Sequence, residues 1–397
     1  MIGSMSELRI LVIATKTPWP PVDGGRLVLL NTIEALAKQG HRIDLVAPCS
    51  EGRNEVANAL APICTPHLVN AQARSGLGSI AVGLATRVPA TIARHTIPAV
   101  RAIAARILAT GEIDVVHAEQ LHALPQADDA QRLGIPIVHR AHNVESMLWA
   151  YSAGHRNVLV RPLLALEARR MSTTEIEALA TTACTIALTE PDRRTLADLD
   201  PGATIHTVPA PFAAVLPAGS AALDGEPAVV TLTSATWAPS RDAIDHLARR
   251  IWPTVRQRLP AAVLHVFGGG RHLDGLDGVV PHPPPDESRT AYPEGSIVVI
   301  PERHPTGVPM KALEAWARGL PLLVDGPSAE ILDAEDGREL VVAKDADGYA
   351  TALARLTEDP TLRQTLVDGG RRKLSENHDP ETIARHLTRI YRWAIDR

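Results

Sequence analysis

The feature that most constrains the fold is an alternation of short apolar runs with helical patterns, which occurs in each half of the chain. The runs are rich in β-branched residues, and most of them end in a polar residue. In the first half they read LRILVIAT, HRIDLVAP, IDVVHAE, IPIVHRAH and CTIALTE, and in the second VVTLTSA, AVLHVFGGG, GSIVVIP, LPLLVDG and RELVVAKD. Helical spacing is expected at 32–39, 99–110, 163–181, 242–258, 310–318, 346–356 and 379–396. This alternation predicts parallel sheets with crossover helices.

A Pro/Ala/Gly-rich stretch, VPAPFAAVLPAGSAALDGEPA, separates the two alternations. The 397 residues exceed one hydrophobic core and suit two domains of roughly 150–200 residues each. We expect an N-terminal Rossmann-like domain at 1–208, a linker at 209–228, a second Rossmann-like domain at 229–378 and a closing helix at 379–397. The expected class is α/β, with two doubly wound parallel-sheet domains facing across a cleft and ligands at the carboxyl ends of the strands.

Composition excludes several classes of protein. The 40 basic and 45 acidic residues give a net charge of −5, which does not favour nucleic-acid binding. No uncharged stretch approaches the ~20 residues of a membrane span. The three cysteines are widely spaced and match no metal-binding pattern, as expected of reduced thiols in a cytosolic protein. We therefore expect a cytoplasmic protein.

Four arginines flanked by apolar residues leave a second localisation open. They could hold a lipid-linked acceptor in weak peripheral contact with the inner face of a membrane, or they could belong to an ordinary solvated helix, which the sequence favours. These residues are Arg87, Arg94, Arg101 and Arg106.

The turn PPVDGG follows the first expected strand and precedes a helical pattern. Gly24 and Gly25 would let backbone N–H groups approach a ligand, and a helix N-terminus favours an anion. The alternative is a tight turn in which the glycines supply positive φ angles. From these residues alone the two interpretations are equally good.

The segment PTGVPMKALEAWARGLPLLVD places Lys311 in the first turn of an expected helix, where the helix dipole disfavours a cation. A lysine there, after Gly307, is favourable if a phosphate group binds at the same place. Glu314, one turn further on, could accept hydrogen bonds from sugar hydroxyls. Alternatively, Lys311, Glu314 and Arg318 form a solvated face opposite the apolar one, with an ion pair worth only ~0.2–0.5 kcal/mol.

Histidine and glutamate side chains follow two expected strands, VVHAEQ and VHRAHNVES. Here His117 and Glu119 stand at one strand end, and His142, Asn143 and Glu145 at the next. Each histidine could be a structural residue, or the two strand ends could form an acceptor pocket in which a histidine positions a hydroxyl group. A metal site is disfavoured because no third and fourth ligand have suitable spacing.

Several motifs in order resemble the retaining glycosyltransferases of family four, which have the GT-B fold. They are PPVDGG, DVVHAE, HRAHNVES, ALTEPDRRTLADL, WAPSRDAIDHL and PMKALEAWARGLPLLV. The last is similar to the family's Lys-x-x-Glu-Ala helix, and WAPSRDAI resembles the opening of the second domain in exopolysaccharide-type sugar transferases. The resemblance covers both domains.

The resemblance implies a hexosyltransferase-type, retaining enzyme that uses a nucleotide-diphosphate sugar and neither cofactor nor metal. Lys311 would contact the diphosphate and Glu314 the ribose or nearby hydroxyls, both with catalytic importance. The other donor-binding residues would be Gly24, Gly25, Gly307, Arg241 and Arg303. The acceptor would lie in the first domain, with His117 and His142 as catalytic candidates and Glu119, Asn143 and Glu145 as binding residues.

Three departures from the family pattern put the donor and the activity in question. Thr306 occupies the place of the first glutamate of a Glu-x7-Glu pattern, one arginine of the exopolysaccharide pattern is absent, and APFA replaces the usual linker motif. Two further function classes therefore stay open beside the transferase, a sugar-nucleotide epimerase of GT-B fold and an inactive relative that serves as a binding subunit. The sequence does not name the sugar, the base or the acceptor.

Overall fold

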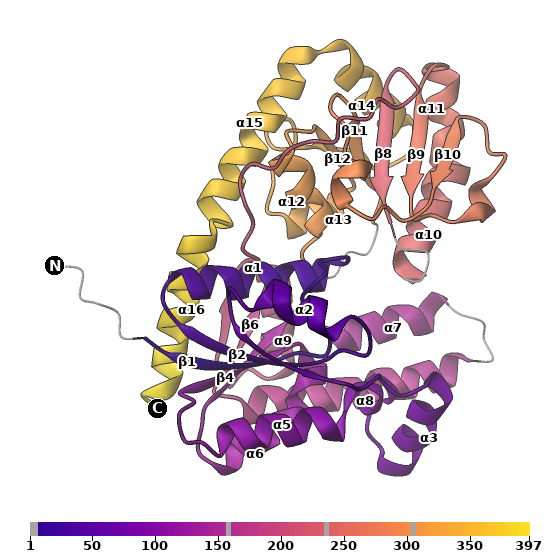
Figure 1. The fold of residues 1–397 in the computed structure, drawn as a ribbon. Helices are drawn as coiled ribbons and strands as arrows, with labels where there is room; N and C mark the ends of the chain where they lie inside the picture. Colours follow the sequence, from indigo (N-terminus) through magenta and orange to yellow (C-terminus); the bar gives the residue numbers. More distant parts are fainter. Residues whose placement is uncertain (1–6, 156–159, 234–237, 303–306) are drawn as a thin grey trace. The chain divides into compact units, whose positions relative to one another are not determined.

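The computed structural model describes residues 7–155, 160–233, 238–302 and 307–397. The chain forms two compact units, each with its own core (Figure 1). The first comprises Met1–Pro211 together with Pro380–Arg397, and the second comprises Phe212–Asp379. The C-terminal helix therefore belongs to the first unit, although the chain reaches it only after building the whole of the second.

The first unit contains a seven-stranded parallel sheet with the order β3-β2-β1-β4-β5-β6-β7. Its central strands are almost fully buried, as expected of a parallel sheet covered by helices on both faces. The strands are β1 (Arg9–Ile13), β2 (Arg42–Pro48), β3 (Thr65–Val69), β4 (Val115–Glu119), β5 (Ile137–Ala141), β6 (Cys184–Ala187) and β7 (Ile205–Thr207).

Helices cover this sheet, and the C-terminal helix α16 completes one face of it. Its apolar stripe, which includes Ile383, Leu387 and Ile390, shares a core cluster with Leu29 and Ile33 of α1. The helices are α1 (Gly24–Lys38), α2 (Arg53–Leu60), α3 (Gly76–Thr86), α4 (Ala90–His95), α5 (Pro98–Leu108), α6 (Asp128–Arg132), α7 (Glu145–His155), α8 (Arg161–Thr181), α9 (Glu190–Leu199) and α16 (Pro380–Ile395).

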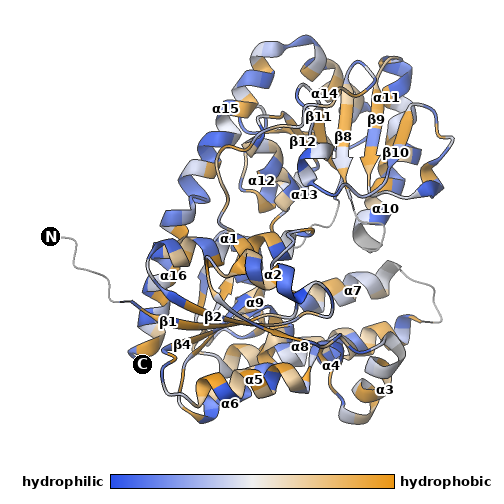
Figure 2. Ribbon diagram, in the orientation of Figure 1, coloured by the Kyte–Doolittle hydropathy of each residue, from blue (hydrophilic) through white to orange (hydrophobic). Residues whose placement is uncertain are grey.

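The second unit repeats this plan with a six-stranded parallel sheet, ordered β10-β9-β8-β11-β12-β13. Its inner strands are apolar and its helices have one apolar side, as their colouring shows (Figure 2). The strands are β8 (Ala228–Leu232), β9 (Val263–Phe267), β10 (Val279–His282), β11 (Ile297–Ile300), β12 (Leu322–Val324) and β13 (Val341–Val342). The helices are α10 (Ala238–His246), α11 (Trp252–Arg258), α12 (Met310–Ala317), α13 (Gly326–Ile331), α14 (Ala346–Glu358) and α15 (Pro360–Asn377), with a π-helical turn at Leu247–Ile251.

The predicted fold class is confirmed, since the chain forms two doubly wound parallel-sheet units. The strands that the sequence analysis did not identify, β3, β7 and β10, all lie toward the outer edges of the two sheets. Edge strands bury little side-chain surface, and β3 and β7 consist of exposed or half-buried residues. Their apolar patterns are correspondingly weak.

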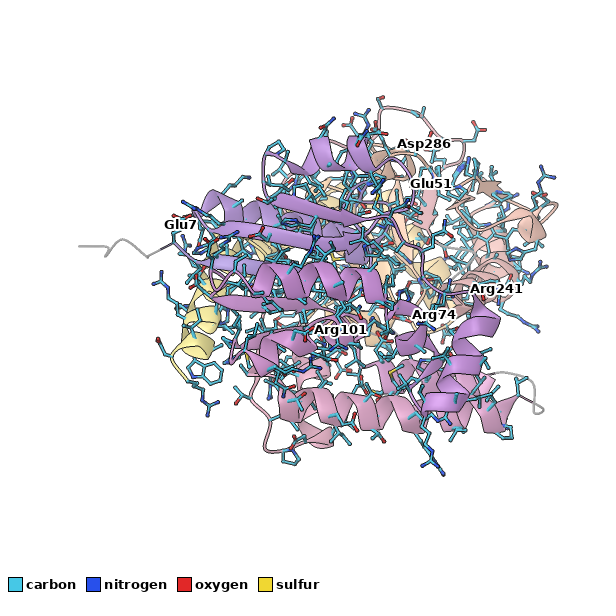
Figure 3. All side chains as sticks on the ribbon, turned by 60° about the horizontal axis from the view of Figure 1, so that its bottom comes forward. Glu7, Glu51, Arg74, Arg101, Arg241 and Asp286 are labelled. Carbon is cyan, nitrogen blue, oxygen red and sulfur yellow. The ribbon has the colours of Figure 1, made fainter. Side chains whose placement is uncertain are left out.

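Two expectations about the surface can be compared with the structure. Among the described residues, no helix is long and apolar enough to cross a bilayer. Arg101, one of the arginines considered for membrane contact, lies on α5 (Figure 3) and pairs with Asp128 at 3.0 Å and Asp129 at 3.3 Å. Its charge is therefore matched by the neighbouring helix α6. The cysteines Cys49, Cys64 and Cys184 are free thiols.

Candidate functional site

The strand order of the first unit creates a switch point between β1 and β4, where the chain leaves the sheet in opposite directions. Ligands of doubly wound sheets bind at the carboxyl ends of the strands at such a point. Thr15, which follows β1, donates its hydroxyl hydrogen to Gln120 Oε1 at 3.4 Å across this point. Gln120 follows β4 and has a φ of 70°, which is uncommon for a residue other than glycine. A strained residue is often found at a functional site.

A buried carboxylate stands beside this switch point. Glu119, the last residue of β4, is 3% exposed and accepts hydrogen bonds from three side chains. Arg140 of β5 donates through Nε and Nη2, both at 2.9 Å. The Nε2 atoms of His117 and His142 lie 2.8 Å and 2.5 Å from the carboxylate oxygens. We call these four residues the Glu119 cluster.

The charges of the Glu119 cluster are set by burial and by the arginine. Burial alone would raise the pKa of Glu119, but Arg140 and the two histidines outweigh it and hold that pKa well below its usual range. Burial, the largest influence on His117, lowers the pKa of its imidazole, although its bond to Glu119 opposes the change. Near neutral pH, Glu119 is therefore an anion and His117 is neutral.

These charges fix how the protons are arranged. An ionised carboxylate can only accept hydrogen bonds, so each histidine must present an Nε2–H group to Glu119. In neutral His117, Nδ1 is then an acceptor. His142 directs its own Nδ1 toward the switch point, 3.3 Å from Gln120 Nε2. The cluster thus orients His142 in the way that a carboxylate orients the histidine of many acid–base sites.

The glycine turn and the histidine motifs meet at this place. A Cβ atom on Gly25 would lie 3.2 Å from Gln120 Nε2 and 3.5 Å from His142 Nδ1. Both Gly24 and Gly25 are part of α1, whose N-cap Asp23 accepts a hydrogen bond from Arg26 N at 2.9 Å. Neither glycine has a positive φ. The alternative of a tight turn that needs such angles is therefore wrong, and close packing explains Gly25 better.

A second pair of carboxyl groups lies at the start of α7. Glu175 of α8 accepts from the backbone N–H groups of Glu145 at 2.6 Å and Ser146 at 3.1 Å, so it caps α7. Burial raises the pKa of both Glu145 and Glu175 to about 7. The neighbouring His142 and a hydrogen bond from Asn143 partly offset the effect of burial at Glu145. Asn143 and Glu145 are half-buried at the edge expected for the acceptor.

Two predicted acceptor-side roles need correction. His117 is 1% exposed and both of its ring nitrogens have partners, so it does not reach a ligand in this structure. Glu119 is equally enclosed, because Arg140 and the two histidines occupy its lone pairs. In this structure both residues are therefore buried members of the Glu119 cluster, and of the two histidines bonded to Glu119 only His142 lies beside the switch point. The sequence could not show this, because a strand end looks the same whether its side chain points outward or inward.

In the second unit, polar side chains gather where β11 ends. Glu302, two residues after β11, accepts from Lys311 Nζ at 2.6 Å and from the Ser240 hydroxyl at 3.4 Å. Ser328 of α13 donates to the carbonyl oxygen of Glu302 at 3.2 Å. Lys311 lies in the first turn of α12, which follows Pro309 without a side-chain cap. The N–H groups at the start of this helix and the lysine together favour an anion.

The alternative interpretation of this helix placed Glu314 on a solvated face, but the structure buries it. It is 6% exposed, and its Oε1 accepts from Arg318 Nη2 at 2.6 Å and, over a short distance, from the Ser288 hydroxyl. The Arg318 guanidinium also lies 5.7 Å from the ring centre of Tyr292. All of α12 except Lys311 is buried, so the bond from Glu314 to Arg318 is part of a packed interior.

The remaining donor-side residues are placed as follows. Gly307 has a φ of 67°, which a glycine adopts without strain. Arg241 is half-buried on α10 (Figure 3). Arg303 and Thr306 lie outside the described residues. Within the described ranges, no group of three or more His, Cys, Asp or Glu side chains is placed to hold a metal ion.

Comparison with known families agrees with this geometry. The family model described as Glycosyltransferase Family 4 matches residues 22–213, and the model described as Glycosyl transferases group 1 matches residues 227–359. Together they cover most of both units. The chain is a family 4-like glycosyltransferase.

Relatives of this glycosyltransferase are distant in sequence. A segment of 114 residues is 29% identical to an uncharacterised glycosyltransferase of Methanocaldococcus jannaschii, which covers 28% of this chain and 29% of that protein. Solved structures match over almost the whole length. The sucrose-phosphate synthase of Thermosynechococcus elongatus is 16% identical, with a TM-score of 0.70 and coverage of 98% of this chain and 99% of the other.

Two further structures share the fold of this glycosyltransferase. HepE of Anabaena, in complex with UDP-glucose, is 14% identical, with a TM-score of 0.64 and coverage of 97% and 99%. TarM is 11% identical, with a TM-score of 0.69 and coverage of 98% and 100%. At these identities the likeness establishes the GT-B fold.

Several residues of the two sites were not identified from the sequence. Arg140 is part of the HRAHNVES motif, but an arginine within a strand gives no sign that it is buried. Tyr391 is part of the closing helix, whose amphipathic pattern does not say which unit it covers. Glu302 follows the run GSIVVIP, and its position at a strand end was the available signal.

Proposed function

We propose that this glycosyltransferase moves a sugar from a nucleotide-diphosphate donor to a hydroxyl acceptor, with retention of configuration and without a metal ion. The second unit binds the donor, and the first unit binds the acceptor. The observation that carries the proposal is the position of Lys311, a cation in the first turn of an uncapped helix at the carboxyl end of β11.

The donor half of the proposal follows from charge. The diphosphate gains negative charge as the bond to the sugar breaks, so groups that bind it more tightly in the transition state lower the barrier. Lys311 and the N–H groups of its turn are such groups. Glu302 holds Lys311 in this structure, and a bound diphosphate would compete with Glu302 for the lysine. The released Glu302 carboxylate can then accept hydrogen bonds from donor hydroxyls.

The acceptor half rests on His142. Glu119 fixes its Nε2–H group, which directs Nδ1 toward Gln120 and Gly25 at the switch point. A ring nitrogen held this way can accept a hydrogen bond from an acceptor hydroxyl and fix its orientation. Orientation of this kind supplies a substantial share of the rate enhancement in a group transfer.

Structures that share this fold suggest the first donors to test. HepE of Anabaena was solved with UDP and glucose and with UDP-glucose, and a TarM variant of S. aureus was solved with UDP. Uridine diphosphate sugars are therefore the first donors to test.

The decisive experiment incubates the full chain with a panel of nucleotide sugars, with and without hydroxyl acceptors, in the presence of a chelator. Acceptor-dependent release of nucleoside diphosphate, and a product with the donor's anomeric configuration by proton NMR, are expected. An inverted product would refute retention and would favour His142 as a general base, because of its pairing with Glu119. An isomeric nucleotide sugar formed without acceptor would mean an epimerase, and nucleotide binding without turnover would mean a binding subunit. Activity that only a divalent ion restores would refute metal independence.

A further inference from the structure

We propose that Tyr391, in the C-terminal helix α16, is a positioning residue for the acceptor side of the reaction. It acts on His142 through His117 and Glu119, without contacting substrate. The inference rests on the proposed function, because it assigns the orientation of the acceptor to the first unit.

An unbroken chain of hydrogen bonds connects the helix to the switch point. Tyr391 Oη lies 2.7 Å from His117 Nδ1, and the two rings meet edge to face with centres 5.9 Å apart. His117 Nε2 lies 2.8 Å from Glu119 Oε2, and Glu119 Oε1 lies 2.5 Å from His142 Nε2. The exposed fraction of the residue rises from 0% at Tyr391 to 8% at His142, so the hydrogen-bond chain extends from the core to the edge of the site.

The direction of every bond in this chain is determined. Because Glu119 only accepts, His117 must donate through Nε2, and its neutral ring then has a lone pair on Nδ1. The Tyr391 hydroxyl must therefore donate to it. Burial raises the pKa of Tyr391 above its ordinary value, so the phenol keeps this proton throughout the working pH range. Tyr391 thus selects the His117 tautomer that presents Nε2–H to Glu119.

Loss of the Tyr391 hydroxyl should affect His142, at the other end of the hydrogen-bond chain. In Tyr391→Phe, Nδ1 of His117 becomes a buried acceptor without a partner, which is a costly state. The ring can relieve it by taking the other tautomer, but its Nε2 lone pair then faces the Glu119 carboxylate. Repulsion between the two would displace Glu119 from its present position. His142 would lose the anchor that directs Nδ1 at the switch point.

The same helix provides a matched control. Thr388, also fully buried on α16, has its hydroxyl 2.8 Å from Nε2 of the buried histidine His41. Thr388→Val therefore also removes a bond between a hydroxyl and a buried imidazole from the same helix. In this bond the imidazole donates, because Leu8 N–H occupies Nδ1 of His41 and the Thr388 hydroxyl donates to the carbonyl oxygen of Ala384. His41 makes its other ring contact with the backbone N–H of Leu8 at 3.2 Å and has no bond to the Glu119 cluster. Both variants disturb the packing of α16, and only one disturbs His142.

Steady-state kinetics on the full chain separates the two. For Tyr391→Phe we expect kcat for transfer to fall about tenfold to a hundredfold, with the KM for the nucleotide sugar within twofold of wild type. For Thr388→Val both constants should stay within twofold of wild type. Equal kcat values in the two variants, at comparable thermal stability, would overturn the proposal. If Tyr391→Phe does not fold, 3-fluorotyrosine at position 391 keeps the ring and makes the hydroxyl a stronger donor to His117 Nδ1, so the nitrogen-15 signal of that atom should shift, and an unchanged signal would count against the proposal.

A second readout needs no substrate and therefore remains decisive if no transfer is found. Nitrogen-15 NMR of labelled histidines reports which ring nitrogen carries the proton. Tyr391→Phe should change the signals of both His117 and His142, whereas Thr388→Val should change those of His41 alone. A wild-type enzyme without transfer would refute the proposed function, while unchanged His142 signals in Tyr391→Phe would refute the hydrogen-bond chain itself.

Discussion

Replacing Arg140 with methionine tests whether the Glu119 cluster is held together by charge. Methionine keeps an unbranched apolar chain in the space beside β5 but removes the guanidinium. Glu119 would then be a buried carboxylate bonded only to His117 and His142. Thr32, whose hydroxyl accepts from Arg140 Nη1 at 2.7 Å, would also lose that donor.

The size of the effect follows from the contacts that are lost. Arg140 makes two hydrogen bonds of 2.9 Å to Glu119, and both residues are almost fully buried. Hydrogen bonds to charged groups contribute ~1.5–3 kcal/mol each, and removal of one partner of a buried ion pair typically costs ~3–5 kcal/mol. We therefore expect Arg140→Met to lower the free energy of unfolding of the first unit by about 3–5 kcal/mol.

Denaturation in urea, together with hydrogen exchange of the β4 and β5 amides, measures this loss in the first unit specifically. The companion variant combines Arg140→Met with Glu119→Gln. It leaves no uncompensated charge in the core, so at least ~1.5 kcal/mol of the loss should be recovered.

The pH dependence has a definite sign. The wild-type pKa of Glu119 is depressed, so the stability it contributes is present above the unfolded pKa of about 4.5 and is lost as pH falls below it. The difference in the free energy of unfolding between wild type and Arg140→Met should therefore become smaller as pH falls toward about 4. A loss below ~1 kcal/mol at pH 7, or a double variant no more stable than Arg140→Met, would refute this reasoning.

Three further predictions concern the two sites. Lys311→Ala should lower kcat about tenfold to a hundredfold, because a charge-assisted bond to the leaving diphosphate is lost, and near-wild-type kinetics for the folded variant would contradict this assignment. Gly25→Ala should lower acceptor-dependent kcat/KM about tenfold, since its Cβ would lie 3.2 Å from Gln120 Nε2, and unchanged kinetics would show that this approach is unimportant. Because burial raises the pKa of Glu145 and Glu175 to about 7, the folded state binds protons that the unfolded state releases, so stability should decrease as pH rises from ~4.5 to ~7; pH titration of urea midpoints should show a flatter profile when both are changed to Gln.

The sequence predicted the fold well because its strongest signals come from the most buried strands. The sheet centres consist of apolar β-branched runs, and their alternation with helices leaves few topologies. Helix limits were harder to predict. The helix α1 begins at Gly24, earlier than its apolar spacing indicates, because Asp23 caps it. The long helix expected at 242–258 is interrupted by a π-helical turn before Trp252. The local sequence pattern does not predict this turn.

The candidate sites were predicted in part. The position at a strand end identified His142 and Gly25 as candidates, and the structure places these two together at one switch point. Lys311 was identified by its place in the first turn of a helix. The roles of His117 and Glu119 could not be assigned, since they depend on partners distant in sequence. Arg140 lies on the neighbouring strand, and Tyr391 reaches His117 from 274 residues away. Contacts of that separation arise from tertiary packing, which a local pattern does not encode.

The return of α16 to the first unit also bears on how the chain matures during synthesis. Domains usually fold in the order in which they leave the ribosome. Here the first unit lacks one of its helices until residues 380–397 emerge, after all of residues 212–379 have been made. At ~5–20 residues per second, that interval lasts on the order of 10–30 s. The second unit can fold first. Until Tyr391 and its neighbours are made, the apolar face of α1 is uncovered and the His117 imidazole lacks its hydroxyl partner. A helix translated after the whole second unit therefore completes the first core. A nascent chain stalled before this helix would expose apolar surface that chaperones bind and that promotes aggregation.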